Sequence, residues 1–182
     1  MSIVSNKSKM NSKMNSQLDY IYFFSGKKAF RSLSNFWENE VVIDDRIYQS
    51  GEHAFHGEKL FRLGHTKYAN KFTKPSSYTP HMAKQKGGEN GLRLNDQELA
   101  QWANISIDVQ KEICKYKLRY EEVKEDLINS KGKLLIHQAL SCRNTENCIW
   151  EGRYVDGNVV GKNLLGNIWM ELRDNLFYTV ES

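Results

Sequence analysis

The chain has 182 residues, of which 40% are aliphatic, aromatic or Cys and 26% are charged, a balance typical of one globular domain. Lys and Arg number 26 against 22 Asp and Glu, but three of the lysines lie in the first sixteen residues, which contain no acid. The remainder is close to neutral, which argues against a broad basic surface for non-specific nucleic-acid binding.

Residues 1–16 contain Ser, Asn, Lys and Met without hydrophobic periodicity, so we expect a disordered basic leader followed by one domain over residues 17–182. The leader lacks the apolar stretch of a secretory signal, and no run approaches the roughly 18 apolar residues that cross a bilayer. These features predict a cytoplasmic protein with no membrane partner. The cysteines (Cys114, Cys142 and Cys148) form neither a CxxC pair nor a Cys/His cluster, which predicts three reduced thiols and no structural zinc site.

The predicted strands are few and early. Tyr20–Phe24 is an aromatic and β-branched run typical of a buried strand. Glu40–Tyr48 carries apolar residues on both sides of Asp44-Asp45-Arg46, which predicts a hairpin with an acidic turn.

The later part of the chain shows helical periods, so we expect a mainly α-helical α+β domain with a small N-terminal β element. Ser50 is placed to cap a helix that runs to about Leu63. The other predicted helices begin at Thr79-Pro80, cover Ile105–Tyr120, and cover Leu165–Leu176. Trp102 precedes the long helix in this interpretation.

One stripe of the first helix combines chemistry-bearing groups with an aromatic ring. Spacings of three, four and seven residues place on it Glu52, Phe55, His56 and Lys59. A solvated stripe with an i,i+4 ion pair is the plainer alternative. Glycines at positions 51 and 57 weaken the helix beside these groups, which indicates close approach of a bulky neighbour.

A metal site is not predicted on this helix. His53 and His56 are three residues apart, no HExxH arrangement exists, and the other histidines add no ligand pattern. We therefore expect no metal here, and the family resemblance described below implies no other cofactor.

Two further segments are polar and rich in turns. The glycines before the last helix, together with Lys162 and the backbone of Asn163, are placed to form a phosphate cradle, although taken alone the motif favours a Gly-rich connection with a lysine in solvent. The loop that contains Ser34, Asn35 and Phe36 is placed either to bind a sugar or phosphate or simply to turn the chain.

The combination of these motifs resembles the YbiA-like, or NADAR, family. The pattern comprises S-N-F, S-x-E-H with a lysine seven residues after the acid, a tryptophan, and W-x-G followed by G-K-N-x-L-G-x-x-x-M-x-x-R. The matching residues are Ser34, Asn35, Phe36, Ser50, Glu52, His53, Lys59, Trp102, Trp150, Gly152, Gly161, Lys162, Asn163, Leu165, Gly166, Met170 and Arg173.

The resemblance implies a metal-independent N-glycosidase that hydrolyses the ribose–nitrogen bond of a phosphoribosylated or ADP-ribosylated base, such as an intermediate of riboflavin synthesis. It makes Glu52 and Lys59 the candidate catalytic residues, with Lys59 either donating a proton or attacking the opened ribose as an amine. The implied substrate-binding residues are Ser34, Asn35, Phe36, His53, Trp102, Trp150, Glu151, Asp156, Lys162 and Asn163. Within this set, Trp102 and Trp150 are expected to sandwich or abut the base.

This chain departs from the family pattern after Trp150, where either Glu151 or Asp156 fills the acidic position. The expected partner is a small phosphoribosyl or ADP-ribosyl molecule. Two alternatives stay open: a hydrolase that removes ADP-ribose from guanine in nucleic acid, and a non-catalytic module that binds ADP-ribose or NAD. The near-neutral domain weighs against a long nucleic-acid footprint.

Overall fold

The computed structural model describes residues 19–88, 90–140, 142 and 144–178, so the predicted leader lies outside the described residues. The helices are α1 (Gly51–Arg62), α2 (Thr66–Ala69), α3 (Pro80–Gly87), α4 (Asp96–Lys117), α5 (Glu121–Asn129) and α6 (Leu164–Tyr178). The strands are β1 (Tyr20–Phe23), β2 (Val41–Ile43), β3 (Arg46–Tyr48), β4 (Leu134–His137), β5 (Arg153–Val155) and β6 (Asn158–Val160). Helices predominate over short strands, which confirms the predicted mainly helical α+β class. No helix in these ranges is both long and apolar enough to span a membrane.

The strands pair in three separate two-stranded sheets, and their placement corrects the expectation that they all lie early. β1 pairs in parallel with β4, in the register Tyr20 opposite Leu134 through Phe23 opposite His137. β2 and β3 form the predicted hairpin, with Asp44 and Asp45 in left-handed conformations at its turn. β5 and β6 form a second hairpin where the sequence indicated only glycine-rich turns.

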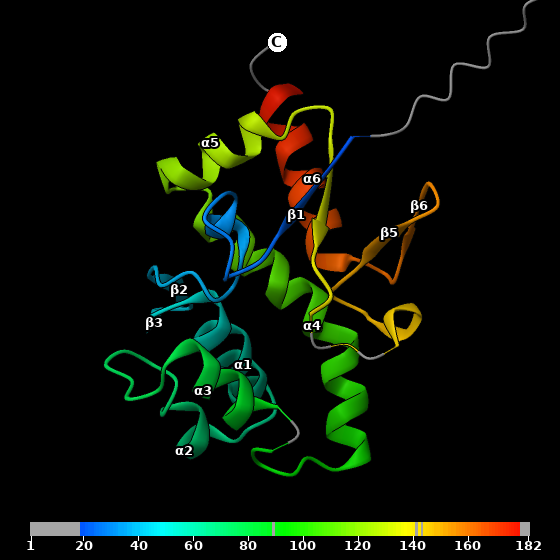
Figure 1. Cartoon of the computed structure of the whole chain (residues 1–182). Coiled ribbons are helices and arrows are strands. Elements are labelled where there is room, and N and C mark those ends of the chain that lie inside the picture. The colour runs from blue at the N-terminus through cyan, green and yellow to red at the C-terminus, as the bar shows by residue number, and fades with distance from the viewer. Residues whose placement is uncertain (1–18, 89, 141, 143, 179–182) are drawn as a thin grey trace, which may run out of the picture.

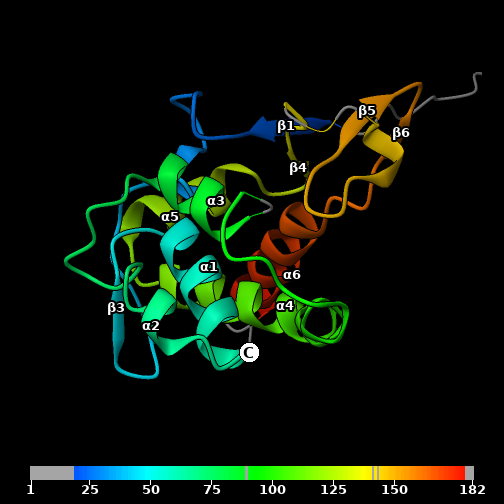
Figure 2. The ribbon, with the colours of Figure 1, turned by 90° about the horizontal axis from the view of Figure 1, so that it is seen from below.

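Two hydrophobic clusters make up the core, and α4 contributes to both of them. Cys114 joins the cluster around β4 and α6, whereas Val109 and Ile113 join the cluster around α1 and the β2–β3 hairpin. Figure 1 shows α4 crossing the molecule between these two halves, with α1, α2 and α3 on one side of it and α6 on the other, and Figure 2 shows α1, α2 and α3 gathered together. The long helix therefore fixes the position of α1 relative to β4.

Helix α1 begins and ends where the sequence predicts. The Ser50 side chain accepts a hydrogen bond from the His53 backbone N–H, and Gly64 takes a φ of 85° just after the helix. The bulky neighbours of the two helical glycines belong to the protein itself. A β-carbon at Gly51 would lie 2.8 Å from Asn35 Oδ1, and one at Gly57 would lie 2.5 Å from the Tyr48 ring.

Other boundaries differ from the predictions. Trp102 lies inside α4 because the helix begins earlier, at a capping box in which Asn95 and Glu98 exchange side-chain and backbone hydrogen bonds. Helices α2 and α5, which have four and nine residues, were not predicted from the sequence. Segments this short carry too few periodic positions to be recognised without their tertiary contacts.

Candidate active site

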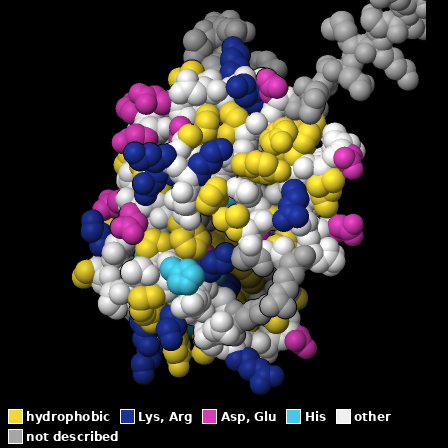
Figure 3. Space-filling view, in the orientation of Figure 1, with side chains coloured by type: hydrophobic (Ala, Val, Ile, Leu, Met, Phe, Trp, Pro, Cys, Tyr) yellow, Lys and Arg dark blue, Asp and Glu magenta, His cyan; other side chains and the backbone are white. Residues whose placement is uncertain are grey.

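A cavity of about 1000 Å³ opens between the two halves of the molecule. Its walls come from the loop after β1, one face of α1, the inner side of α3, the start and middle of α4, and the segment from β4 to Glu151. Figure 3 shows this face hollowed near its centre, with Lys or Arg side chains inside and hydrophobic side chains around it. Of the predicted site residues, the cavity wall includes Ser34, Asn35, Phe36, Glu52, Lys59, Trp102, Trp150 and Glu151.

The face of α1 places a carboxylate, an imidazole and an amine together in this wall. The residues Glu52, His56 and Lys59 are each buried, with 8% residual exposure. His56 Nε2 lies 3.2 Å from Glu52 Oε1, and Lys59 Nζ donates to the Gly87 carbonyl. Burial lowers the pKa of Lys59, and the neighbouring Glu52 opposes that shift. The plainer alternative of a solvated stripe is therefore wrong.

Three aromatic rings form a continuous wall beside these groups. Phe55, one residue before His56, has its ring centroid 5.0 Å from that of Trp102 and 5.3 Å from that of Trp150. Both contacts are edge-to-face, an arrangement that aromatic quadrupoles favour. Because Phe55 contacts both indoles, the two tryptophans share one wall that presents ring surface to the cavity.

The loop that contains Ser34, Asn35 and Phe36 is anchored from behind by α4. Asn35 and Gln110 exchange a pair of amide hydrogen bonds of 2.8 and 3.0 Å, and Lys117 Nζ donates to the Ser34 carbonyl at 2.8 Å. These bonds hold the loop against the helix while all three of its predicted site residues remain in the cavity wall.

The cavity wall also carries a second carboxylate, Glu151, and another cation, Lys84. Burial raises the pKa of Glu151. The negative charge of Glu52 adds to this shift of the pKa, whereas the positive charge of Lys84 opposes it. Lys84, from α3, also lies over the Phe36 ring, 5.7 Å from its centroid. His137, at the end of β4, has its pKa lowered by burial to about 4, which keeps its ring neutral. The cavity therefore combines acidic, basic and aromatic surfaces.

His53 is buried but does not line the cavity. Its ring is held between the Ser50 hydroxyl, 2.8 Å from Nδ1, and the Tyr78 carbonyl, 2.9 Å from Nε2. Burial lowers the pKa of His53, so a neutral ring donates to Tyr78 and accepts from Ser50. This geometry indicates a structural role in fixing the start of α1.

The backbone N–H groups of the predicted phosphate cradle at α6 are already bonded within the protein. The N–H groups of Lys162 and Asn163 donate to the carbonyls of Cys148 and Glu151, and the next two N–H groups donate to Ile149 and Trp150. The Asn163 side chain accepts from the backbone N–H of His137 and donates to the Leu135 carbonyl, which ties α6 to β4. Lys162 is exposed and lines no part of the cavity.

Asp156 also lies outside the cavity. It is exposed at the turn between β5 and β6, with a φ of 47°. Of the two acids left open by the sequence, Glu151 is therefore the one at the cavity.

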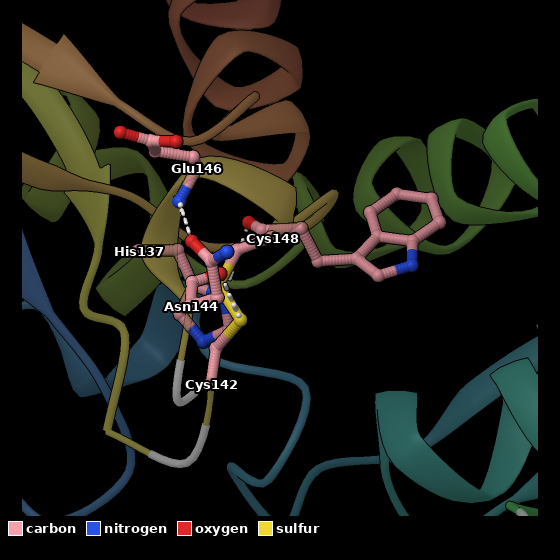
Figure 4. The surroundings of a disulfide bond; sticks show 6 residues. His137, Cys142, Asn144, Glu146 and Cys148 are labelled. Atoms are coloured by element: carbon pink, nitrogen blue, oxygen red, sulfur yellow. Dashed lines mark hydrogen bonds between the residues drawn. A yellow bond between two sulfur atoms is a disulfide. The ribbon is translucent and has the colours of Figure 1, made fainter.

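The cysteines correct the expectation of three reduced thiols. Cys142 and Cys148 form a disulfide across a short loop after β4, with a Cα–Cα distance of 6.2 Å (Figure 4). Their spacing gave no signal because the loop folds back on itself, which brings the two Cα atoms within bonding range. Cys114 is a free, buried thiol, and burial raises its pKa to about 12. The expected absence of a disulfide is wrong for this one pair.

Several cavity residues were missed or only partly noticed. The helical period places Phe55 and His56 on the α1 stripe, although the family resemblance did not include them among the expected site residues. Lys84, Gln110 and His137 come from separate elements and carry no local motif, so only the packing of those elements brings them to the cavity.

Comparison with known proteins identifies the family. The NADAR domain family matches residues 22–177. Proteins named N-glycosidase YbiA from Shigella flexneri and Shigella boydii are each 27% identical over 158 residues, which covers 86% of this chain and 88% of theirs. The NMR structure of the E. coli protein YbiA shares the fold, with a TM-score of 0.67 and 23% identity over 90% of this chain and 88% of that one. These matches confirm the resemblance and the expected enzyme class of hydrolases that act on N-glycosyl bonds, and the chain belongs to the NADAR domain family.

Proposed function

We propose that this protein hydrolyses the N-glycosidic bond of a small phosphoribosylated or ADP-ribosylated base, without a metal. The observation that carries the proposal is the burial of Glu52 and Lys59 on one face of α1, in the wall of a cavity lined with aromatic rings. The names of the curated relatives support the same reaction type.

Glu52 is the proposed catalytic carboxylate. Cleavage of a ribose–nitrogen bond develops positive charge on the sugar, as in other glycosidases, and a nearby carboxylate stabilises that charge or activates the attacking water. The His56 ring contacts Glu52 Oε1, and the Glu52 backbone N–H donates to the Asn35 carbonyl at 2.9 Å. Glu52 is thus oriented at both ends before any substrate binds.

Lys59 has two chemical roles that an experiment separates. Its lowered pKa favours proton donation and, equally, the neutral amine that attacks an opened ribose to form an imine. Borohydride reduces an imine to a stable secondary amine. Substrate-dependent addition of mass at Lys59 after borohydride treatment identifies the covalent role, and unmodified protein identifies proton donation.

The cavity supplies distinct surfaces for the parts of such a substrate. The wall of Phe55, Trp102 and Trp150 accommodates the flat face of a base. Because every base has such a face, stacking on this wall favours no single base strongly. Lys84 lines the cavity and is the proposed phosphate-binding cation, in place of Lys162. Ser34 and Asn35 lie at the same cavity and are the proposed ribose contacts.

The test compares three substrates: a phosphoribosylamino-pyrimidine, ADP-ribosyl-guanosine and NAD. We expect release of free sugar phosphate or ADP-ribose from at least one of them, and we expect Glu52→Gln to lower kcat by 100-fold or more while the protein remains folded. Removal of one general acid–base group typically costs a factor of about 10² to 10⁴. Binding of all three without turnover would refute the proposal and favour a non-catalytic module.

A further inference from the structure

We propose that Cys142, Cys148 and Glu151 form a binding site for a thiophilic divalent cation such as Zn²⁺ once their disulfide is reduced, and that the bound cation inhibits hydrolysis. The inhibitory part depends on the proposed function, whereas the binding part does not.

The geometry places three ligand atoms together. The two Sγ atoms and a Glu151 carboxylate oxygen all lie within 4.8 Å of one another. A tetrahedral zinc ion with Zn–S bonds near 2.3 Å holds two sulfur atoms about 3.8 Å apart. The Cα atoms of the cysteines are already 6.2 Å apart, so we expect side-chain rotation to bring the sulfurs to that separation.

The chemistry of the donor set selects the metal. Two thiolates and one carboxylate suit Zn²⁺ and other borderline or soft cations, and they suit Mg²⁺ and Ca²⁺ poorly. All three residues line the cavity, so the fourth coordination position faces the space that a substrate would fill. A water molecule or a substrate oxygen is able to occupy that position.

The metal site exists only in the reduced protein, because the two sulfur atoms either bond to each other or bind the cation. Figure 4 shows them joined to each other, with Asn144 and Glu146 on the short loop between them. A dithiol reductant converts the disulfide to two thiols and is itself oxidised to a cyclic disulfide. Binding of Zn²⁺ to the two thiols then releases two protons, one from each sulfur.

The position of Glu151 gives the inhibition its mechanism. Glu151 is half-buried at the cavity and interacts electrostatically with Glu52 and Lys84, which line the same cavity. A cation that takes this carboxylate removes it from the substrate and also adds positive charge to the cavity wall.

The binding test uses the full chain without substrate. After treatment with a dithiol and removal of the reductant under nitrogen, Zn²⁺ is titrated in competition with a chromogenic chelator, and proton release is followed in weak buffer. We expect one Zn²⁺ and about two protons per reduced chain. We expect no binding by the oxidised protein or by Cys148→Ser.

Two acid variants make the ligand assignment specific. Glu151→Gln should weaken Zn²⁺ binding at least as much as the roughly 10- to 100-fold that loss of an outer-shell partner costs. Glu146→Gln is the matched control, since Glu146 belongs to the same loop but not to the group of three ligands, and it should bind Zn²⁺ normally. Equal binding by the oxidised protein or by Cys148→Ser, or no binding by the reduced protein, would overturn the site.

The inhibition is measured separately on a substrate that the protein turns over. Zn²⁺ should inhibit the reduced protein and leave the Cys148→Ser protein unaffected. Binding without inhibition would overturn the inhibitory role. An inactive protein that still binds one Zn²⁺ would instead mark a failure of the proposed function, so the two failures are distinguishable.

Discussion

Helix α1 carries a second buried carboxylate, Glu58. Comparing its removal with that of Glu52 distinguishes a structural acid from the proposed catalytic acid. Its side chain is fully buried and accepts hydrogen bonds from Arg46 Nε at 2.8 Å, Arg46 Nη2 at 2.9 Å, Tyr48 Oη at 2.6 Å and Arg62 Nε at 3.2 Å. Glu58 does not line the cavity. It therefore joins the β2–β3 hairpin to α1 without contacting the proposed substrate.

We expect Glu58→Gln to lower the free energy of unfolding by about 3 kcal/mol. Breaking a buried ion pair by removing one partner typically costs about 3–5 kcal/mol. The lower end applies because the side chains of Arg46 and Arg62 are 27% and 28% exposed, so water is able to solvate both guanidinium groups in the variant. For a chain of this length, 3 kcal/mol corresponds to a decrease in Tm of roughly 6–12 °C.

The assay combines urea unfolding with kcat per folded molecule. Glu58→Gln should unfold at lower urea concentration yet keep its turnover, whereas Glu52→Gln should lose turnover and stay nearly as stable as the wild type. The matched control is Glu112→Gln, which removes the 2.6 Å partner of Arg62 at a carboxylate that is 43% exposed and should cost under about 1 kcal/mol. Equal destabilisation by Glu58→Gln and Glu112→Gln would refute the reasoning.

Three further predictions concern the core, the aromatic wall and metals. Burial lowers the pKa of Lys117 to about 8, so between pH 8 and 10.5 the unfolded state binds more protons than the folded state. The unfolding free energy of the wild type should therefore rise with pH over this range by up to about 3 kcal/mol relative to that of Lys117→Met. A difference between the two proteins that stays constant with pH would contradict this prediction. Phe55→Leu removes the edge-to-face contacts with Trp102 and Trp150, so it should raise KM about tenfold with little change in kcat. The control Phe61→Leu changes a ring outside the cavity and should leave KM unchanged. EDTA should leave the activity of the oxidised protein intact, and a loss restored by added metal would refute metal-independent hydrolysis.

Local signals in the sequence determined the helix that carries the proposed chemistry. The cap at Ser50 and the left-handed Gly64 set the ends of α1, and the 3.6-residue period placed Glu52 and Lys59 on one face. These features depend on residues within a few positions of each other, so they can be read without knowing the fold.

Tertiary structure alone decided what that face meets. The pairing of β1 with β4, more than a hundred residues apart, brings His137 to the cavity, and the packing of α3 and α4 brings Lys84 and Gln110. The same packing uses the α6 N–H groups internally. Such contacts depend on which distant surfaces bury one another, and the free energy of that burial is shared across the whole core, so no single stretch of sequence records it.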